Sequence, residues 1–290
     1  MKKFAESELI INPDGSVYHI KLHPEQIADT VIVVGDQHRV ETISKYFDDI
    51  EFKVQSREFV THTGTYRNKR ITALSTGIGT DNIDIVINEL DAAVNIDLKT
   101  RMLKDTFRSL DIIRLGTSGA LQADIPVDSF VMSSHGLGLD GLLNFYQPKK
   151  NIFNDDIAEA FIKHTKWNKK LARPYVVKGS EKLMKQLGKG LTSGITATAC
   201  GFFGPQGREL RIPLAVPDLN EKIETFRFEK HRITNFEMET SALYGLCMVL
   251  GHQALTICDI IANRLSKKYS KDYKISVEKM IQMVLERLTS

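Results

Sequence analysis

The stretch Asp111-Ile112-Ile113-Arg114-Leu115-Gly116-Thr117-Ser118-Gly119 combines two patterns. Its first half is a short apolar run interrupted by one arginine, which is typical of a buried strand. Its second half consists of small residues with two glycines, which predicts a turn after the strand. Ligands of parallel α/β sheets bind beyond the carboxyl ends of the strands, so this turn is the first candidate for a binding site.

Arg114 is the unusual residue in this stretch. Burying an unpaired guanidinium is costly, so Arg114 should have an anionic partner, and its planar fork suits phosphate. Gly116 and Gly119 would let backbone N–H groups approach an anion, and Thr117 and Ser118 would add hydroxyl donors. An internal ion pair with a carboxylate is the alternative, and this segment alone leaves both interpretations open.

Two strands further upstream end in the same way. Thr30-Val31-Ile32-Val33-Val34 precedes Gly35, and Ile71-Thr72-Ala73-Leu74 runs into the turn at Gly77. The carboxyl ends of parallel strands meet at one edge of a sheet. The turns at Gly35, Gly77 and Gly116 should therefore converge on one site.

The rest of the chain continues this alternation of strands and helices. Apolar periodicity predicts further strands over residues 130–132 and 254–258. It predicts helices over residues 40–46, 82–94, 237–250 and 276–288. Such alternation is typical of an α/β fold with a mainly parallel or mixed sheet. No segment resembles a linker, so residues 1–290 are expected to form one domain.

The composition narrows the class of protein. The 290 residues are 42% hydrophobic and 26% charged, which is enough apolar material for a sizeable core. A net charge of +3 does not indicate a nucleic-acid binder but suits an enzyme for a small anionic substrate. Residues 1–6 do not resemble a signal peptide, and no apolar run approaches a membrane span. We therefore expect a cytoplasmic protein with no membrane partner.

Metal and nucleotide motifs are weak in this sequence. Cys200, Cys247 and Cys258 have no metal or redox spacing, so no metal site is predicted. Gly77-x-Gly79-x-x-Asn82 lacks the third glycine of the dinucleotide fingerprint and follows the second strand rather than the first. No P-loop lysine follows any of the glycine turns, which argues against an NTPase.

Five segments taken together resemble the nucleoside phosphorylase superfamily with the hexameric-type fold, and within it the uridine-cleaving enzymes. They are Gly35-Asp36-x-x-Arg39-Val40, Ser56-Arg57-Glu58-Phe59, Ser75-Thr76-Gly77-Ile78-Gly79, Arg114-x-Gly116-Thr117-Ser118-Gly119 and Asn235-Phe236-Glu237-Met238-Glu239. All five occur in the family's order, and the resemblance runs from His19 to Arg264. It implies a single-domain three-layer sandwich around a central mixed sheet.

The resemblance also implies roles for individual residues. The phosphate-binding set would be Gly35, Arg39, Arg57, Arg114, Gly116 and Thr117, and the ribose-binding set would be His19, Met238 and Glu239. His19 and Arg57 would reach the active site of a neighbouring subunit, so the smallest working unit would be a homodimer. Without the family, His19 would be interpreted as a surface histidine, and the acidic residues 237 and 239 as favourable charges at a helix N-terminus.

The segment from Phe202 to Arg208 bears on which base is bound. By the resemblance, Gln206 and Arg208 would bind the edge of uracil, Phe202 would pack against it and Arg264 would support the uracil carbonyl. The amide of Gln206 can both donate and accept, which suits uracil N3–H and a carbonyl. Asp259 departs from this pattern because purine-specific relatives place a catalytic aspartate near that position. It leaves purine use, a broader specificity or an unrelated salt bridge open.

The implied reaction is phosphorolysis of uridine to uracil and ribose 1-phosphate, with Arg114, Glu239 and Arg208 as the catalytic residues. It would pass through an oxocarbenium-like ribosyl cation and would need no metal or organic cofactor. A monovalent cation at the dimer interface is a further expectation, with Glu58 and the Ile78 carbonyl as ligands, although Asn82 replaces the family's usual serine. A phosphate-independent nucleosidase is the alternative activity.

Overall fold

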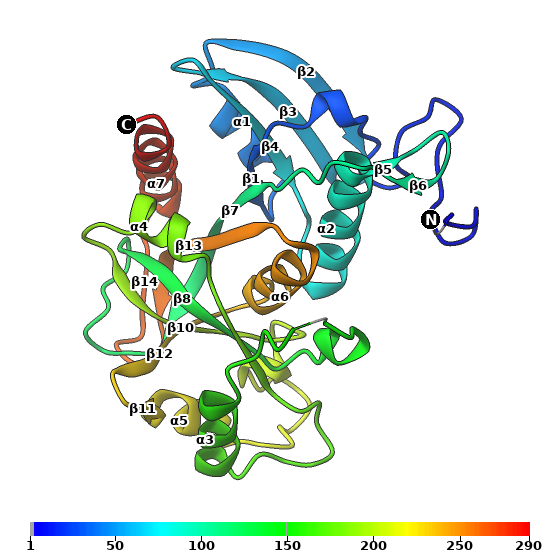
Figure 1. The fold of residues 1–290 in the computed structure, drawn as a ribbon. Coiled ribbons are helices and arrows are strands. Elements are labelled where there is room, and N and C mark those ends of the chain that lie inside the picture. Colours follow the sequence, from blue (N-terminus) through cyan, green and yellow to red (C-terminus); the bar gives the residue numbers. More distant parts are fainter. Residues whose placement is uncertain (1–2, 149) are drawn as a thin grey trace.

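One mixed sheet runs through the molecule in the computed structural model, which describes residues 3–148 and 150–290 (Figure 1). Twelve strands of these residues form it, in the order β11-β12-β10-β8-β13-β7-β1-β4-β3-β2, with β14 paired to β13 and β9 paired to β8. The strands are β1 (Thr30–Val34), β2 (Asp49–Ser56), β3 (Phe59–Tyr66), β4 (Lys69–Ser75), β7 (Asp111–Ala120), β8 (Phe130–Gly138), β9 (Tyr175–Lys178), β10 (Thr192–Thr198), β11 (Arg227–Phe228), β12 (His231–Glu237), β13 (Gln253–Asn263) and β14 (Lys268–Tyr269). A separate hairpin joins β5 (Ile96–Asp97) to β6 (Met102–Leu103).

Helices cover both faces of this sheet. They are α1 (His38–Ser44), α2 (Thr80–Asn95), α3 (Asp155–Thr165), α4 (Glu181–Leu187), α5 (Leu219–Thr225), α6 (Thr240–Leu250) and α7 (Tyr273–Leu288), with 3-10 turns at Pro24–Gln26, Leu142–Phe145 and Gly204–Gln206. Side chains of β1 alternate between two cores. Val31 and Val33 pack with α2 and α6, whereas Ile32 and Val34 pack with α1, α4 and α7. This arrangement of helix, sheet and helix confirms the predicted fold class.

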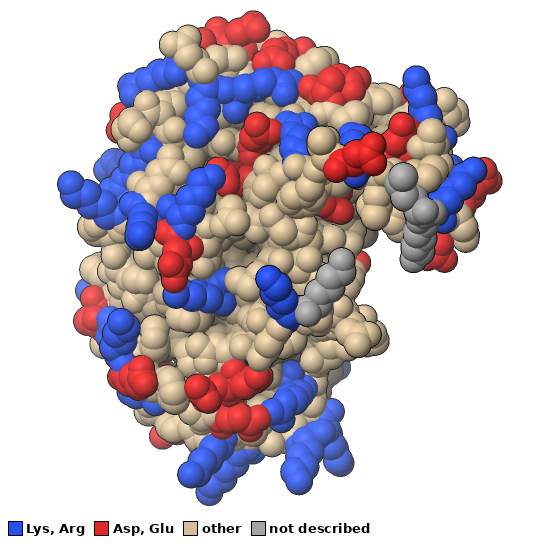
Figure 2. Space-filling view, in the orientation of Figure 1, with Lys and Arg blue, Asp and Glu red and all other residues tan. Residues whose placement is uncertain are grey.

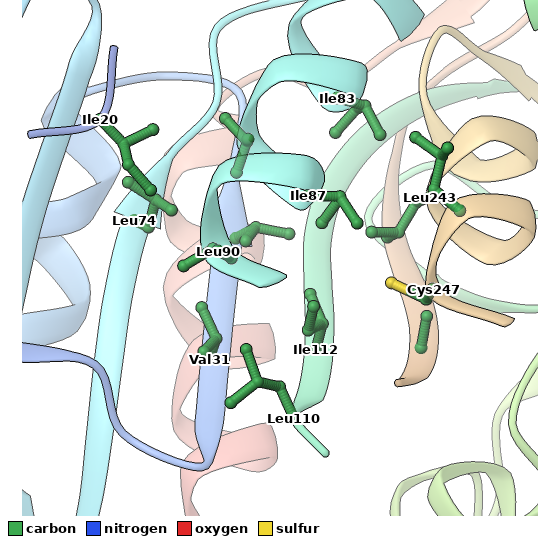
Figure 3. Close-up of a cluster of buried hydrophobic side chains, with 14 of the residues drawn as sticks. Ile20, Val31, Leu74, Ile83, Ile87, Leu90, Leu110, Ile112, Leu243 and Cys247 are labelled. Atoms are coloured by element: carbon green, nitrogen blue, oxygen red, sulfur yellow. The ribbon is translucent and has the colours of Figure 1, made fainter. Parts of the chain in front are cut away.

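The packing of α2 shows how its sequence directs it onto the sheet. Ile83, Ile87 and Leu90 recur at helical spacing and are fully buried. Figure 3 shows them between β1 and β7 on one side and Leu243 and Cys247 of α6 on the other. Because α2 is fixed in this way, the glycine turn that precedes it is fixed at the edge of the sheet.

Strands β1, β4, β7 and β13 are parallel neighbours. β1 ends at Val34, opposite Ser75 of β4, and its pairing with β7 ends at Arg114. The predicted strands at 30–34, 71–74, 111–115, 130–132 and 254–258 are therefore confirmed, and so are the helices around 40–46, 82–94 and 276–288. The carboxyl ends of β1, β4 and β7 lie at one edge, as expected.

Two details of the prediction were wrong. Residues 116–119 do not form a turn: β7 continues to Ala120, because β13 pairs with it from Gln253 to Asn263. The helix predicted from residue 237 begins at Thr240 instead, because Glu237 is still paired with Thr198 as the last residue of β12. Both errors come from sheet partners that are distant in the sequence.

The far end of β7 also closes part of the sheet. Phe236 and Asn235 of β12 pair with Gly119 and Ala120, so strands β7, β13, β8, β10 and β12 form a continuous ring. Closure brings the end of β12 beside the end of β7. It thereby places the acidic segment 237–239 next to Arg114.

Charged residues of both signs are interspersed over the face shown in Figure 2, in keeping with the small net charge. Among the described residues, no helix is long and apolar enough to cross a membrane. Met1, Lys2 and Lys149 lie outside the described residues. Met1 and Lys2 belong to residues 1–6, the segment in which no signal peptide was expected.

Candidate active site

A cavity of about 750 Å³ opens at the carboxyl ends of β1, β4 and β7. It brings together most of the residues singled out from the sequence, although they come from distant parts of the chain. These are Gly35, Arg39, Arg114, Gly116, Thr117, Phe202, Gln206, Arg208, Met238 and Glu239. The predicted convergence of the three glycine segments is therefore confirmed.

Two guanidinium groups, those of Arg39 and Arg114, line this cavity close enough for their charges to interact. Burial lowers the pKa of Arg39, and the positive charge of Arg114 lowers it further, whereas Asp36 opposes both effects. Arg39 donates to the Leu115 carbonyl at 3.1 Å. Within residues 3–148 and 150–290 it has no carboxylate within salt-bridge distance. A dianion placed between the two arginines would relieve their mutual repulsion.

Arg114 itself contacts two carboxylates. Its Nη1 lies 3.2 Å from Glu237 Oε2, and its Nη2 donates to Glu239 Oε2. Burial alone would lower the pKa of Arg114, but the two carboxylates outweigh it and the pKa is raised. The internal ion pair left open by the sequence is therefore present. Arg114 Nε is buried and has no hydrogen-bond partner within the described chain, so the guanidinium keeps a donor for a further acceptor.

Glu239 connects Arg114 to the glycine turn that precedes α2. One of its oxygens accepts from the Gly79 amide at 2.8 Å, and the other accepts from Arg114. Burial and the neighbouring Glu237 raise the pKa of Glu239, and Arg114 opposes this rise. A carboxylate held in this way can accept further hydrogen bonds from hydroxyl groups while it remains in contact with Arg114.

Glycine is needed at position 116 for a different reason from the one predicted. A Cβ at this position would lie 2.0 Å from Arg114 Nη1, with Cys258 Sγ at 3.1 Å behind it. The side chain of Arg114 therefore crosses directly over the backbone of residue 116. The absence of a side chain there makes room for the guanidinium.

We expect Gly116→Ala to displace Arg114 and to destabilise the fold by about 1–3 kcal/mol, as overpacking usually does. Thermal unfolding and the KM for phosphate measure the two effects. Gly119→Ala is the matched control for stability on the same strand, since a Cβ there would meet nothing nearer than 3.9 Å. Equal unfolding temperatures for the two variants would contradict this packing.

The loop after β10 contributes Phe202, Gln206 and Arg208 to the lining of the cavity. Arg208 lies over the ring of Phe202, with 3.7 Å from Cζ to the ring centroid. Its Nη1 donates to Gln206 Oε1 at 2.7 Å, which leaves the Gln206 amide nitrogen free to donate elsewhere. Arg264 does not line the cavity and instead donates to the Gln206 carbonyl. Burial and the nearby Arg208 lower the pKa of Arg264 to about 10.

His19 and Arg57 lie outside the lining of this cavity. They approach the same aromatic ring: Tyr18 contacts His19 edge-on at 4.7 Å between ring centroids, and Arg57 Cζ lies 5.7 Å from the Tyr18 centroid. Glu89 holds His19 through Nδ1 at 2.6 Å. Arg57 has a φ of 55° in the turn between β2 and β3, a strained backbone for a residue other than glycine.

Asp259 is fully buried but does not line the cavity. Its Oδ2 accepts from Ser276 Oγ of α7 at 2.5 Å, and its Oδ1 has no partner among the described residues. Burial raises the pKa of Asp259 to about 6, partly offset by Ser276. Its position favours a structural role in the contact between β13 and α7.

The raised pKa of Asp259 predicts a pH dependence of stability. Between its ordinary value of 3.8 and about 6, the folded state holds the proton longer than the unfolded state. Its contribution is therefore fully present below pH 3.8 and is lost as the pH rises through about 6. Asp259→Asn should raise the unfolding free energy at pH 7 by about 1–3 kcal/mol and flatten that slope. Denaturant titrations at several pH values measure this, and an unchanged slope would contradict it.

The residues expected near a monovalent cation also line the cavity. Glu58, Ile78 and Asn82 all belong to its wall, and the Asn82 amide nitrogen faces Glu58 Oε1 at 3.4 Å.

The structure adds lining residues that the sequence did not indicate: Asp36, Gln37, Ile261, Ala262 and Tyr269. Tyr269 reaches the cavity because β14 folds back and pairs it with Ala262. Ile261 is bulged out of the β13–β7 pairing. Neither feature has a local sequence pattern, because both depend on pairing between separate strands.

This fold and this site define a class of protein. Residues 29–290 match the phosphorylase superfamily. The chain therefore belongs to that superfamily, which confirms the resemblance and the predicted type of enzyme. Members of this class act on nucleosides and phosphate, and the cavity holds most of the residues expected to bind them.

Particular relatives refine the comparison. The chain is similar to a uridine phosphorylase of Thermococcus kodakarensis, with 31% identity over 277 residues that cover 93% of this chain and 86% of the relative. A DeoD-type purine nucleoside phosphorylase of Colwellia psychrerythraea is 26% identical over 271 residues, covering 92% and 97%. The solved structure of a Trypanosoma brucei nucleoside phosphorylase with uridine phosphorylase activity has a TM-score of 0.87 at 30% identity, covering 97% of this chain and 99% of that one.

Proposed function

We propose that this protein cleaves uridine with inorganic phosphate to give uracil and ribose 1-phosphate. The observation that carries the proposal is that one cavity is lined by three groups of residues. They are Arg39 with Arg114, Glu239 in contact with Arg114, and Gln206 in contact with Arg208. The similarity to the Thermococcus kodakarensis uridine phosphorylase supports the choice of base.

In this reaction Gly35, Arg39, Arg114 and Thr117 hold the phosphate below C1′ of the ribose, and Gly116 makes room for the Arg114 side chain. There the dianion stabilises the ribosyl cation as the glycosidic bond lengthens, and then forms the new C1′–O bond. Met238 packs on the sugar, and Glu239 accepts hydrogen bonds from the hydroxyl groups of the sugar. Since Arg114 contacts Glu239 directly, the nucleophile and the sugar are oriented by one connected pair of side chains.

Gln206 and Arg208 recognise and stabilise the departing uracil. Arg208 fixes Gln206 Oε1, so the amide nitrogen donates to a uracil carbonyl, and the guanidinium meets the negative charge that develops on the base. Phe202 provides the apolar contact and Arg264 holds the loop from behind.

The two alternatives have separate expectations. A nucleosidase would use water, so its rate would not depend on phosphate. Initial rates of nucleoside cleavage by phosphate-free protein, with and without added phosphate, test this: we expect cleavage only with phosphate, and equal rates would refute phosphorolysis. The similarity to purine nucleoside phosphorylases favours a purine nucleoside as the substrate. The position of Asp259 argues against this, because its carboxylate accepts from Ser276 and does not line the cavity.

The proposal includes a homodimer in which His19 and Arg57 complete the neighbouring site. Their shared position around Tyr18, outside the chain's own cavity, supports this. Arg39→Ala and Arg57→Ala should each be inactive. Mixing the two after dissociation should restore a fraction of wild-type activity, because each mixed dimer contains one intact site. No recovery in mixed dimers would contradict a shared site.

A further inference from the structure

The Glu237 carboxylate lines the cavity and is bonded through both of its oxygens. Its side chain is 2% exposed, and both oxygens accept hydrogen bonds. Oε1 accepts from Thr198 Oγ1 at 2.6 Å. Oε2 accepts from the Glu239 amide at 3.0 Å, and the Thr240 amide lies 3.0–3.1 Å from both oxygens. Together with Arg114 Nη1 at 3.2 Å, these partners occupy the carboxylate completely.

These contacts fix the backbone that carries Met238 and Glu239. The first amides of a helix lack partners within the helix and favour a negative charge. Glu237 satisfies two of them at the start of α6 and so holds residues 237–240 in a tight loop around its own carboxylate. These bonds restrain the backbone of the segment that carries Met238 and Glu239.

The same carboxylate orients Arg114. The guanidinium contacts Glu237 through Nη1 and Glu239 through Nη2. The Nε of the same guanidinium has no hydrogen-bond partner among the described residues. Without Glu237, the guanidinium would keep Glu239 and the long contact of Nη1 with Cys258 Sγ at 3.8 Å, but it would lose one of its two carboxylates.

We propose that Glu237, held by Thr198, is a positioning residue for the phosphate-binding Arg114 and the ribose-binding Glu239. The proposal rests on the proposed function for the identity of the ligands. Glu237 acts through its neighbours, because all its acceptor positions are occupied. Thr198 is the second residue of this arrangement. It is fully buried and lies outside the cavity lining. Its hydroxyl donates to Glu237 and accepts from the Ser241 amide at 3.0 Å.

Glu237→Gln is the direct variant, and we expect it to raise the KM for phosphate and lower kcat. Its buried amide would also face backbone donors, so loss of folding is a risk for this variant. Thr198→Val is the sharper test because it removes only one hydroxyl, at a residue that does not contact the substrates. Thr198→Ser keeps the hydroxyl and serves as the rescue.

Thr72→Val is the matched control. Thr72 is equally buried, and its Oγ1 likewise bonds one side-chain oxygen, of Thr63, and one backbone amide, of Ala28, both at 2.8 Å. It lies on β4 away from the cavity lining. Thr72→Val should therefore lose a similar amount of stability while keeping the kinetic constants.

The experiment measures the dissociation constant for inorganic phosphate by calorimetry, together with kcat, KM and the unfolding temperature. Thr198→Val should weaken phosphate binding by about tenfold, the effect of one lost hydrogen bond to a charged group, and Thr198→Ser should restore it. Phosphate affinity and kinetics equal to those of Thr72→Val would overturn the proposal. A wild-type protein that binds phosphate but cleaves no nucleoside would refute the proposed function alone, and one that binds no phosphate would overturn both.

Discussion

Replacing Arg114 by alanine should reduce phosphate-dependent turnover by about three orders of magnitude or more. A single preorganised donor in a transition-state site commonly contributes a factor of 10² to 10³. Arg114 supplies such a donor and also carries a full charge beside the proposed phosphate. Steady-state rates at saturating nucleoside and varied phosphate measure the loss.

The same replacement should destabilise the protein. It leaves Glu237 and Glu239 buried without their shared cation, and breaking a buried pair in this way costs about 3–5 kcal/mol. Arg232→Ala is the control, because Arg232 pairs with Asp124 at the surface, where an ion pair contributes about 0–1 kcal/mol. Normal phosphate dependence in folded Arg114→Ala would refute the pocket assignment.

Replacing Gln206 by leucine should lower kcat/KM for uridine by about two to three orders of magnitude. Leucine keeps the volume but removes the polar edge, and a site built to hydrogen-bond a ligand loses heavily when a buried partner is left unpaired. Arg208 would also lose its contact with Gln206 Oε1. Substrate competition between uridine and thymidine or inosine separates lost recognition from general damage.

A matched substitution nearby controls for disturbance of the loop. Asn220→Leu removes the side-chain amide that donates to the Gly207 carbonyl at 3.3 Å, next to the same loop but outside the cavity lining. It should retain uridine specificity. If Gln206→Leu has the same kinetic constants as Asn220→Leu, then Gln206 does not bind the base.

Local sequence predicted those parts of the cavity in which a glycine closely follows a strand along the chain. The runs before Gly35 and Gly77 are apolar and β-branched, so their ends and the convergence of those ends followed from the pattern. Residues 116–119 show the limit of this reasoning. Their small side chains are typical of a turn, yet pairing with β13 keeps them extended, and Gly116 serves the side chain of Arg114 rather than a nest of amides.

Partners distant in sequence explain what remained unpredicted. Glu237 stays in β12 because Thr198 of β10 pairs with it, which moves the start of α6 to Thr240. Tyr269 enters the cavity through the pairing of β14 with β13. The direction in which Asp259 points depends on its contact with α7, and no pattern within residues 254–264 contains that information.

The most direct test of the account is product formation from a panel of uridine, thymidine and inosine, each with and without phosphate. The account predicts that purified protein releases uracil and ribose 1-phosphate from uridine only when phosphate is present. Release of hypoxanthine from inosine with phosphate, and no uracil from uridine, would contradict it.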